Sequence, residues 1–201
     1  MKHESIEDAL VVRALREVGE NVTSVYDLVN TKRSYKAAIP VLIDLLPKIN
    51  DPLVKEGIVR ALAVKEAVSD DKAIGRLIEE FRKIAPEDRS AQMLKWAIGN
   101  TLSVIARDAQ YEQIAALIRE EGHGKAMEMI VLALGHMKKQ SGAVDVLIDL
   151  LNDESLAGHA AMALRKLKAK CAKTALERSL SHPRDWVRNE VTKALKAICR
   201  N

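Results

Sequence analysis

A few charged and aromatic side chains are the residues of this sequence best suited to molecular recognition. Glu56 and Arg60 are four positions apart, a spacing that brings a carboxylate and a guanidinium together on one face of a helix. Trp96, one of two tryptophans, lies between Lys95 and Ala97 in the stretch LKWAIGN. An indole offers a large amphipathic surface with one N–H donor and is a common anchor in interfaces. These residue types therefore indicate binding.

The sequence lacks the common catalytic and metal-binding patterns. No two of its five histidines have the spacing of metal ligands on a helix, and no HExxH, GxxxxGK[ST] or GxSxG motif occurs. The two cysteines, Cys171 and Cys199, do not form a CxxC motif, so we expect reduced thiols. We therefore predict no catalytic residue, no metal and no cofactor, although absent motifs do not exclude an enzyme. The histidines are His3, His123, His136, His159 and His182.

The composition favours closely packed helices. Of the 201 residues, 48% are hydrophobic but only 3% are aromatic, so most of the apolar side chains are small or aliphatic. No apolar run approaches the roughly 18 to 20 residues that span a bilayer. The N-terminal segment MKHESIEDAL has acidic residues where a signal peptide would be apolar. We expect a cytoplasmic protein without a membrane contact.

The net charge of +4 is unevenly distributed along the chain. Residues 1–140 hold 21 basic and 21 acidic residues, whereas residues 165–200 hold 11 basic and 3 acidic ones. A basic end of this kind could attract an anionic partner. It is also typical of a solvated helical end, and we favour this interpretation.

An internal repeat predicts the architecture. AIPVLIDLL (38–46) and AVDVLIDLL (143–151) match at seven of nine positions, and AIGRLIEEF (73–81) keeps the same pattern at an offset of 35. A second helical segment that ends in an Ala-Leu-like pair follows each copy. Two helices in each unit of roughly 30 to 40 residues indicate an α-solenoid. The pairs are Ala61-Leu62, Thr101-Leu102, Ala133-Leu134, Ala163-Leu164 and Ala194-Leu195.

These spacings predict an all-α solenoid of about six antiparallel helix pairs that forms one continuous domain. Residues 1–33 are expected to form an N-terminal capping pair, because a terminal unit has one face in water. Residues 34–201 are expected to form the repeat array. Its five units are approximately 34–68, 69–107, 108–139, 140–169 and 170–201.

Two segments resemble the second helix of HEAT repeats. DPLVKEGIVRAL (51–62) and DWVRNEVTKAL (185–195) both begin with an Asp cap and continue with a Val-Arg/Lys pair and an Ala-Leu pair. The pattern is most similar to the bacterial PBS-lyase HEAT-like subgroup. PEDRSAQMLKWAIGNTL and EGHGKAMEMIVLAL depart from it. The resemblance implies a HEAT-like superhelix that acts as a scaffold, with its concave groove lined by the second helices.

The Ala-Leu register separates core side chains from side chains that point away from the core. Trp96 lies off the core stripe of its helix, and we expect it in the groove rather than packed against a neighbouring repeat. Trp186 is expected to cover the C-terminal end of the core. The residues predicted to bind a partner in the groove are Glu56, Arg60, Lys95, Trp96, Asn100, Glu128, Leu132, His159, Met162, Asn189 and Lys193.

The preferred function is a non-enzymatic, monomeric scaffold that binds a protein or peptide in this groove. The alternative is a nucleic-acid-binding HEAT-like protein, similar to the HEAT-like DNA glycosylases, that uses the basic C-terminal repeats with Arg165, Lys193 and Lys196. The charge balance of the first 140 residues argues against it. A bilin lyase is suggested only by the name of the subgroup.

Overall fold

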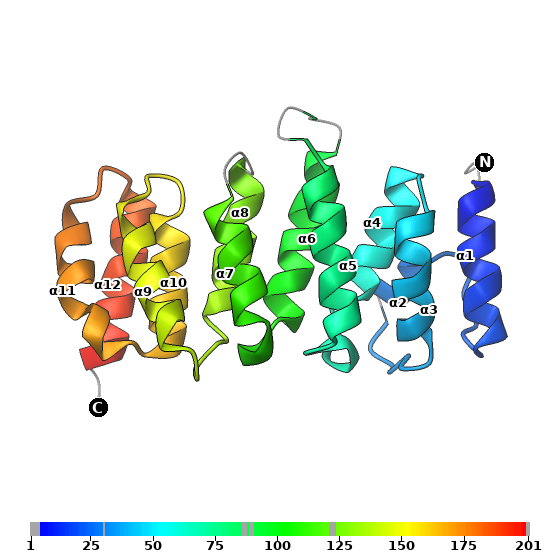
Figure 1. The fold of residues 1–201 in the computed structure, drawn as a ribbon, viewed down its shortest axis with the longest axis horizontal. Helices are drawn as coiled ribbons and strands as arrows, with labels where there is room; N and C mark the ends of the chain where they lie inside the picture. The colour runs from blue at the N-terminus through cyan, green and yellow to red at the C-terminus, as the bar shows by residue number, and fades with distance from the viewer. Residues whose placement is uncertain (1–4, 30, 86–87, 89–90, 121–123, 200–201) are drawn as a thin grey trace. The chain divides into compact units, whose positions relative to one another are not determined.

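The computed structural model describes residues 5–29, 31–85, 88, 91–120 and 124–199, and within them it contains helices and no strand. The all-α class is therefore confirmed. The chain divides into two compact units, Met1–Ile105 and Ala106–Asn201. Each unit consists of helices packed side by side (Figure 1). The prediction of one continuous domain with five repeat boundaries stays a prediction.

Unit 1 begins with a long and a short helix and continues with two helix pairs. In the second pair α5 packs on α6, in the first pair α4 contacts η1, which continues α3, and the second helices α4 and α6 contact each other. The helices are α1 (Ile6–Glu17), α2 (Tyr26–Val29), α3 (Ala38–Leu45), η1 (Leu46–Lys48), α4 (Pro52–Ala61), η2 (Lys65–Ala67), α5 (Asp71–Lys83) and α6 (Gln92–Ile105).

Unit 2 contains three helix pairs, in which α8, α10 and α12 are the second helices and pack on one another in that order. The helices are η3 (Asp108–Gln110), α7 (Tyr111–Arg119), η4 (Gly124–Ala126), α8 (Met127–Leu134), α9 (Ser141–Asp149), η5 (Leu150–Asn152), α10 (Ala157–Leu167), η6 (Lys170–Ala172), α11 (Lys173–Arg178), η7 (Ser179–Ser181) and α12 (Asp185–Cys199).

Local sequence signals explain the start of α4. The Asp51 carboxylate accepts hydrogen bonds from the backbone N–H groups of Leu53, at 3.0 Å, and Val54, at 3.2 Å. Pro52 occupies the first helical position, where its missing N–H costs no hydrogen bond. The start of α12 differs from the expected cap, because Asp185 is itself the first residue of the helix and its carboxylate accepts from Arg188.

The core of each unit is aliphatic. The leucines of the Ala-Leu pairs in α4, α6, α8 and α10 are fully buried, and so are the residues that face them from the first helices. The single phenylalanine, Phe81, is also fully buried on α5. Because the helices are short, these contacts between helices, rather than intrinsic propensity, supply most of their stability. The leucines are Leu62, Leu102, Leu134 and Leu164.

We expect truncation of a core leucine to destabilise the protein strongly. Leu62→Ala removes a side chain with 0% exposure and leaves a cavity, at a cost of about 2–5 kcal/mol. Leu147→Ala tests unit 2 in the same way. Leu53→Ala makes the same change at a position on α4 that is 68% exposed, and we expect a cost below about 0.5 kcal/mol. Urea denaturation measures the free energy of unfolding of each variant. Equal losses of stability in Leu62→Ala and Leu53→Ala would contradict the assigned register.

Candidate functional site

In unit 1, three side chains from α4 and α6 form a connected cluster. Arg60 donates from Nε to the Glu56 carboxylate at 2.7 Å, and its Nη2 lies 2.6 Å from the same oxygen. The guanidinium carbon of Arg60 lies 5.9 Å from the centre of the Trp96 ring, within the range of a cation–π contact. We call Glu56, Arg60 and Trp96 the α4–α6 cluster.

The α4–α6 cluster lies at the edge of the core and not inside it. Trp96, Glu56 and Arg60 are each half-buried, while Ala97 and Ile98 of the same helix are buried. Trp96 therefore packs one part of its ring on Arg60 and leaves another part accessible to solvent. The predicted position of Trp96 off the core stripe agrees with this burial.

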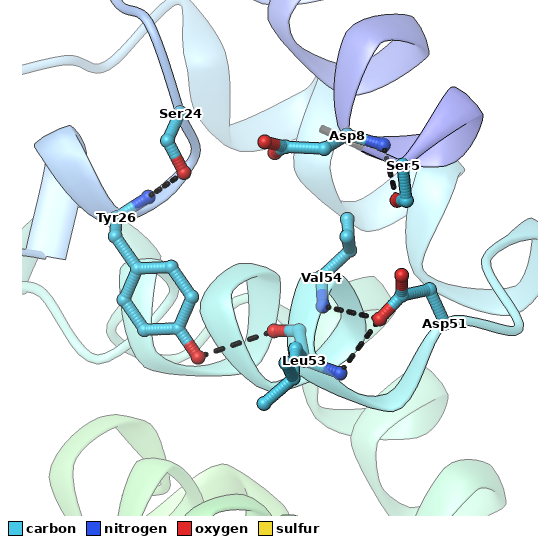
Figure 2. Close-up of a pocket in the computed structure, with 7 residues that line it drawn as sticks. All are labelled: Ser5, Asp8, Ser24, Tyr26, Asp51, Leu53 and Val54. Carbon is cyan, nitrogen blue, oxygen red and sulfur yellow. Dashed lines mark hydrogen bonds between the residues drawn. The ribbon is translucent and has the colours of Figure 1, made fainter. Parts of the chain in front are cut away.

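A small cavity in unit 1 is lined mainly by polar residues, but their polar groups hold the helices together. Its volume is about 130 Å³, and Figure 2 shows Asp51 and the Tyr26 hydroxyl at its wall. The Tyr26 hydroxyl donates to the Leu53 carbonyl at 3.1 Å, and Asp51 caps α4. A hydrogen bond from the Ser5 side chain, together with those from the Val54 and Leu53 backbone, keeps the pKa of the Asp51 carboxyl below its usual value. The lining residues are Ser5, Asp8, Ser24, Tyr26, Asp51, Leu53 and Val54.

In unit 2, Trp186 reaches from α12 onto α10. Its ring lies directly over Gly158, since a Cβ atom added there would be 2.1 Å from two of the ring carbons. The His159 ring meets the indole at an interplanar angle of 63°, with 5.3 Å between centroids. Trp186 remains 39% exposed. The expectation that it covers the C-terminal end of the core is therefore wrong, because its ring packs on the preceding second helix.

His159 also faces the carboxylate of Glu128 on α8, with 4.0 Å between Nε2 and the nearest carboxylate oxygen. Burial lowers the pKa of His159 below its ordinary value of 6.5, and the nearby carboxylates of Glu128 and Glu190 offset part of this effect. The imidazole is therefore neutral near pH 7. We call Glu128, His159 and Trp186 the α8–α12 cluster.

Glu190 lies near the same cluster but already has positive partners. Its carboxylate is 3.3 Å from Nη1 of Arg165 and 2.6 Å from Nζ of Lys193. Two of the three cations predicted to attract a nucleic acid, Arg165 and Lys193, are thus paired with Glu190.

Lys95 does not lie on a partner-binding surface, contrary to the prediction. Its side chain has 0% exposure, its Nζ donates to the Ile84 carbonyl at 2.7 Å, and the same nitrogen lies 5.1 Å from the Phe81 ring centre. A cation at the C-terminal end of α5 is favoured by the helix dipole. The missed signal is its position seven residues before Leu102, which is two helical turns and hence the core face.

Lys55 repeats this arrangement on α4, seven residues before Leu62. Its Nζ lies 2.7 Å from the carboxylate of Glu80, which is nearly buried on α5. The two lysines therefore join the second helices α4 and α6 to α5, the first helix that lies between them in the chain. The other ten predicted site residues are half-buried or exposed.

Within the described part of the chain, no group of three or more His, Cys, Asp or Glu residues could hold a metal ion. The described helices include none that is long and apolar enough to cross a membrane. His3 and His123 lie outside the described residues.

The contact between Gly158 and Trp186 leads to a specific expectation. Gly158→Ala must displace the indole, because the new methyl group would overlap the ring, and we expect a loss of about 1–3 kcal/mol and a shifted Trp186 indole N–H resonance in NMR spectra. Gly75→Ala, on α5 with no atom within 4 Å of the added carbon, is the control and should stabilise the protein by roughly 0.4–1 kcal/mol. An unmoved Trp186 resonance in Gly158→Ala would refute the assigned packing.

Comparisons with known proteins agree with this architecture. Residues 111–196 match the family model of HEAT repeats, which supports a HEAT-repeat protein. The crystal structure of an engineered protein from the Northeast Structural Genomics Consortium is similar in fold, with a TM-score of 0.51 and 20% sequence identity over 94% of this chain and 96% of that chain. No curated protein matches the sequence significantly. The chain has the fold of an α-solenoid, and residues 111–196 are similar to HEAT repeats.

Proposed function

We propose that this protein is a non-enzymatic scaffold that binds a protein or peptide segment on the surface of its second helices. The observation that carries the proposal is the position of its two tryptophans. Both lie on second helices, Trp96 beside Arg60 and Trp186 beside His159, and both are partly exposed to solvent, whereas Phe81 is completely buried.

The chemistry of both clusters suits a polypeptide partner. Tryptophan and arginine are enriched among the residues that contribute most to protein interfaces, and charged neighbours give register and specificity. Within each unit, stacked helix pairs also present these side chains on a rigid surface. The surface therefore offers aromatic anchors inside a mixed-charge rim.

We also propose that this protein is bacterial, belongs to the PBS-lyase HEAT-like subgroup and acts as a monomer in the cytoplasm. Cys171 and Cys199 are free and exposed, which suits a reducing compartment.

One observation favours nucleic-acid binding as a second candidate. His136 is surrounded by Lys166, Arg107 and Lys138, and burial together with these cations lowers its pKa to about 4. Such a cluster attracts phosphate groups. It lies at the C-terminal ends of α8 and α10, where cations also stabilise the helix dipoles. A duplex titrated at low and moderate salt tests it, and micromolar binding with a steep salt slope would favour this candidate.

The main proposal predicts that Trp96 is required for peptide binding and not for folding. Display of random peptides against the full chain should enrich binders, and Trp96→Ala should weaken them by roughly tenfold or more while the melting temperature stays near that of the wild type. Met93→Ala, at a 60% exposed position on the same helix, is the matched control and should change affinity by less than about twofold. If no peptide were enriched, or if the peptides bound Trp96→Ala as tightly as the wild type, the second helices would not be the binding surface.

A further inference from the structure

The two clusters are built at equivalent positions of the repeat. Glu56 and Glu128 each precede the buried leucine of their helix by six residues, on α4 and α8. On the next second helix, α6 or α10, the same position holds Trp96 in unit 1 and Gly158 in unit 2. The Trp186 ring from α12 covers Gly158. Each unit therefore presents a carboxylate on one second helix and an indole over the equivalent position of the next.

The third component of the cluster is present only in unit 1. Arg60 precedes Leu62 by two residues, and its guanidinium contacts both the Glu56 carboxylate and the Trp96 ring. The equivalent residue of α8, two before Leu134, is Leu132. A leucine has no charge to offer Glu128 and no donor for its oxygens. Unit 2 thus has the carboxylate and the indole without the guanidinium.

The charge of Glu128 is left without a full positive counterpart. Among the described residues, the ion-pair neighbour of Glu128 is the His159 ring, at 4.0 Å. That ring is neutral near pH 7, since burial lowers its pKa below 6.5. The nearby cations Arg165 and Lys193 are bound to Glu190. Glu128 nevertheless keeps 24% of its side chain exposed, so a ligand can reach it.

We propose that the α8–α12 cluster binds an arginine side chain of the partner, whose guanidinium bonds the exposed part of the Glu128 carboxylate and stacks on the exposed part of the Trp186 ring, beside His159. In unit 1, Arg60 occupies the equivalent place, so the protein itself shows the chemistry that completes the site. Arginine is favoured over lysine because its planar group can stack on an indole and bond a carboxylate at the same time. This inference rests on the proposed function and names the partner's chemistry.

The attraction between the arginine side chain and this cluster comes from the cluster itself and not from the net charge of unit 2. Residues 106–201 carry 16 basic and 12 acidic residues, so the net charge of unit 2 repels a cationic ligand. Binding of arginine here therefore requires the specific contacts with Glu128 and Trp186. General electrostatic attraction would favour an anion.

His159 makes the site sensitive to pH. His159 lies on α10, as Arg165 does. Its ring faces Glu128 on α8, and it also faces Trp186 and Glu190, which are both on α12. A protonated imidazole would supply the positive charge that Glu128 lacks and would repel the guanidinium. Because its pKa lies below 6.5, arginine binding is fully present at neutral pH and is lost as the pH falls through that pKa.

The test uses two pentapeptide probes that differ in one group. The full-length protein is labelled with ¹⁵N and titrated with acetyl-Ser-Gly-Arg-Gly-Ser-amide or with the same peptide carrying citrulline, the neutral analogue of arginine. We expect a saturable shift of the Trp186 indole N–H and roughly tenfold weaker binding of the citrulline peptide. The Trp96 resonance is an internal control and should not move, since Arg60 already occupies its site.

Matched variants separate the site from general effects. Glu128→Gln should reduce binding of the arginine peptide to the citrulline level, whereas Glu112→Gln, an exposed change in the same unit, should leave it unchanged. Leu132→Arg should supply the missing guanidinium from the chain itself and block the peptide. Arg60→Leu should have the converse effect and make the Trp96 resonance respond. Equal binding of both peptides, or wild-type affinity in Glu128→Gln, would overturn the proposal.

Two further outcomes separate the levels of the inference. Affinity for the arginine peptide should fall as the pH is lowered below 6.5, and His159→Gln should remove most of that fall. A fall unchanged in His159→Gln would overturn the role of His159. Displayed peptides that need Trp96, together with equal binding of the arginine and citrulline probes, would reject the arginine site alone. A response of Trp186 to arginine without any displayed binder would reject the scaffold function alone.

Discussion

The recognition surfaces of both units depend on how closely consecutive second helices pack. The residue before the core leucine is small on every second helix, with alanine or threonine at a buried position. The approach is close enough that a Cβ added to Gly135 at the end of α8 would lie 3.1 Å from the Cα of Ala163 on α10. Side chains from neighbouring second helices can therefore meet, as Arg60 of α4 meets Trp96 of α6 and His159 of α10 meets Trp186 of α12.

Close packing also decides which charged groups are available to a partner. Lys55 and Lys95 lie on the core side of their helices and are bound by α5, through Glu80 and the Ile84 carbonyl. Arg60 lies on the outer side but is bound by Glu56 and Trp96. Burying a charge without a partner is costly, so each of these groups is paired inside its unit. Glu128 differs, because its neighbour His159 is neutral near pH 7.

The differences between the two units indicate which chemical group a partner could supply. A solenoid repeats the same backbone positions, so a residue that is satisfied in one repeat indicates what is missing in another. Arg60 and Leu132 are such a pair. The two residues occupy the same backbone position in different repeats of one chain, and only the side chain differs.

The sequence by itself determined the helices, their pairing and the aliphatic core, because these depend on local signals such as the Asp51 cap and on a period that repeats along the chain. It also determined that Trp96 lies off the core stripe, which is a property of one helix. The tertiary structure alone decided the partners of the Lys95 ammonium and the contact of Trp186 with Gly158. Both are long side chains that reach a different helix, and helical periodicity describes the direction of a side chain but not what it meets at its far end.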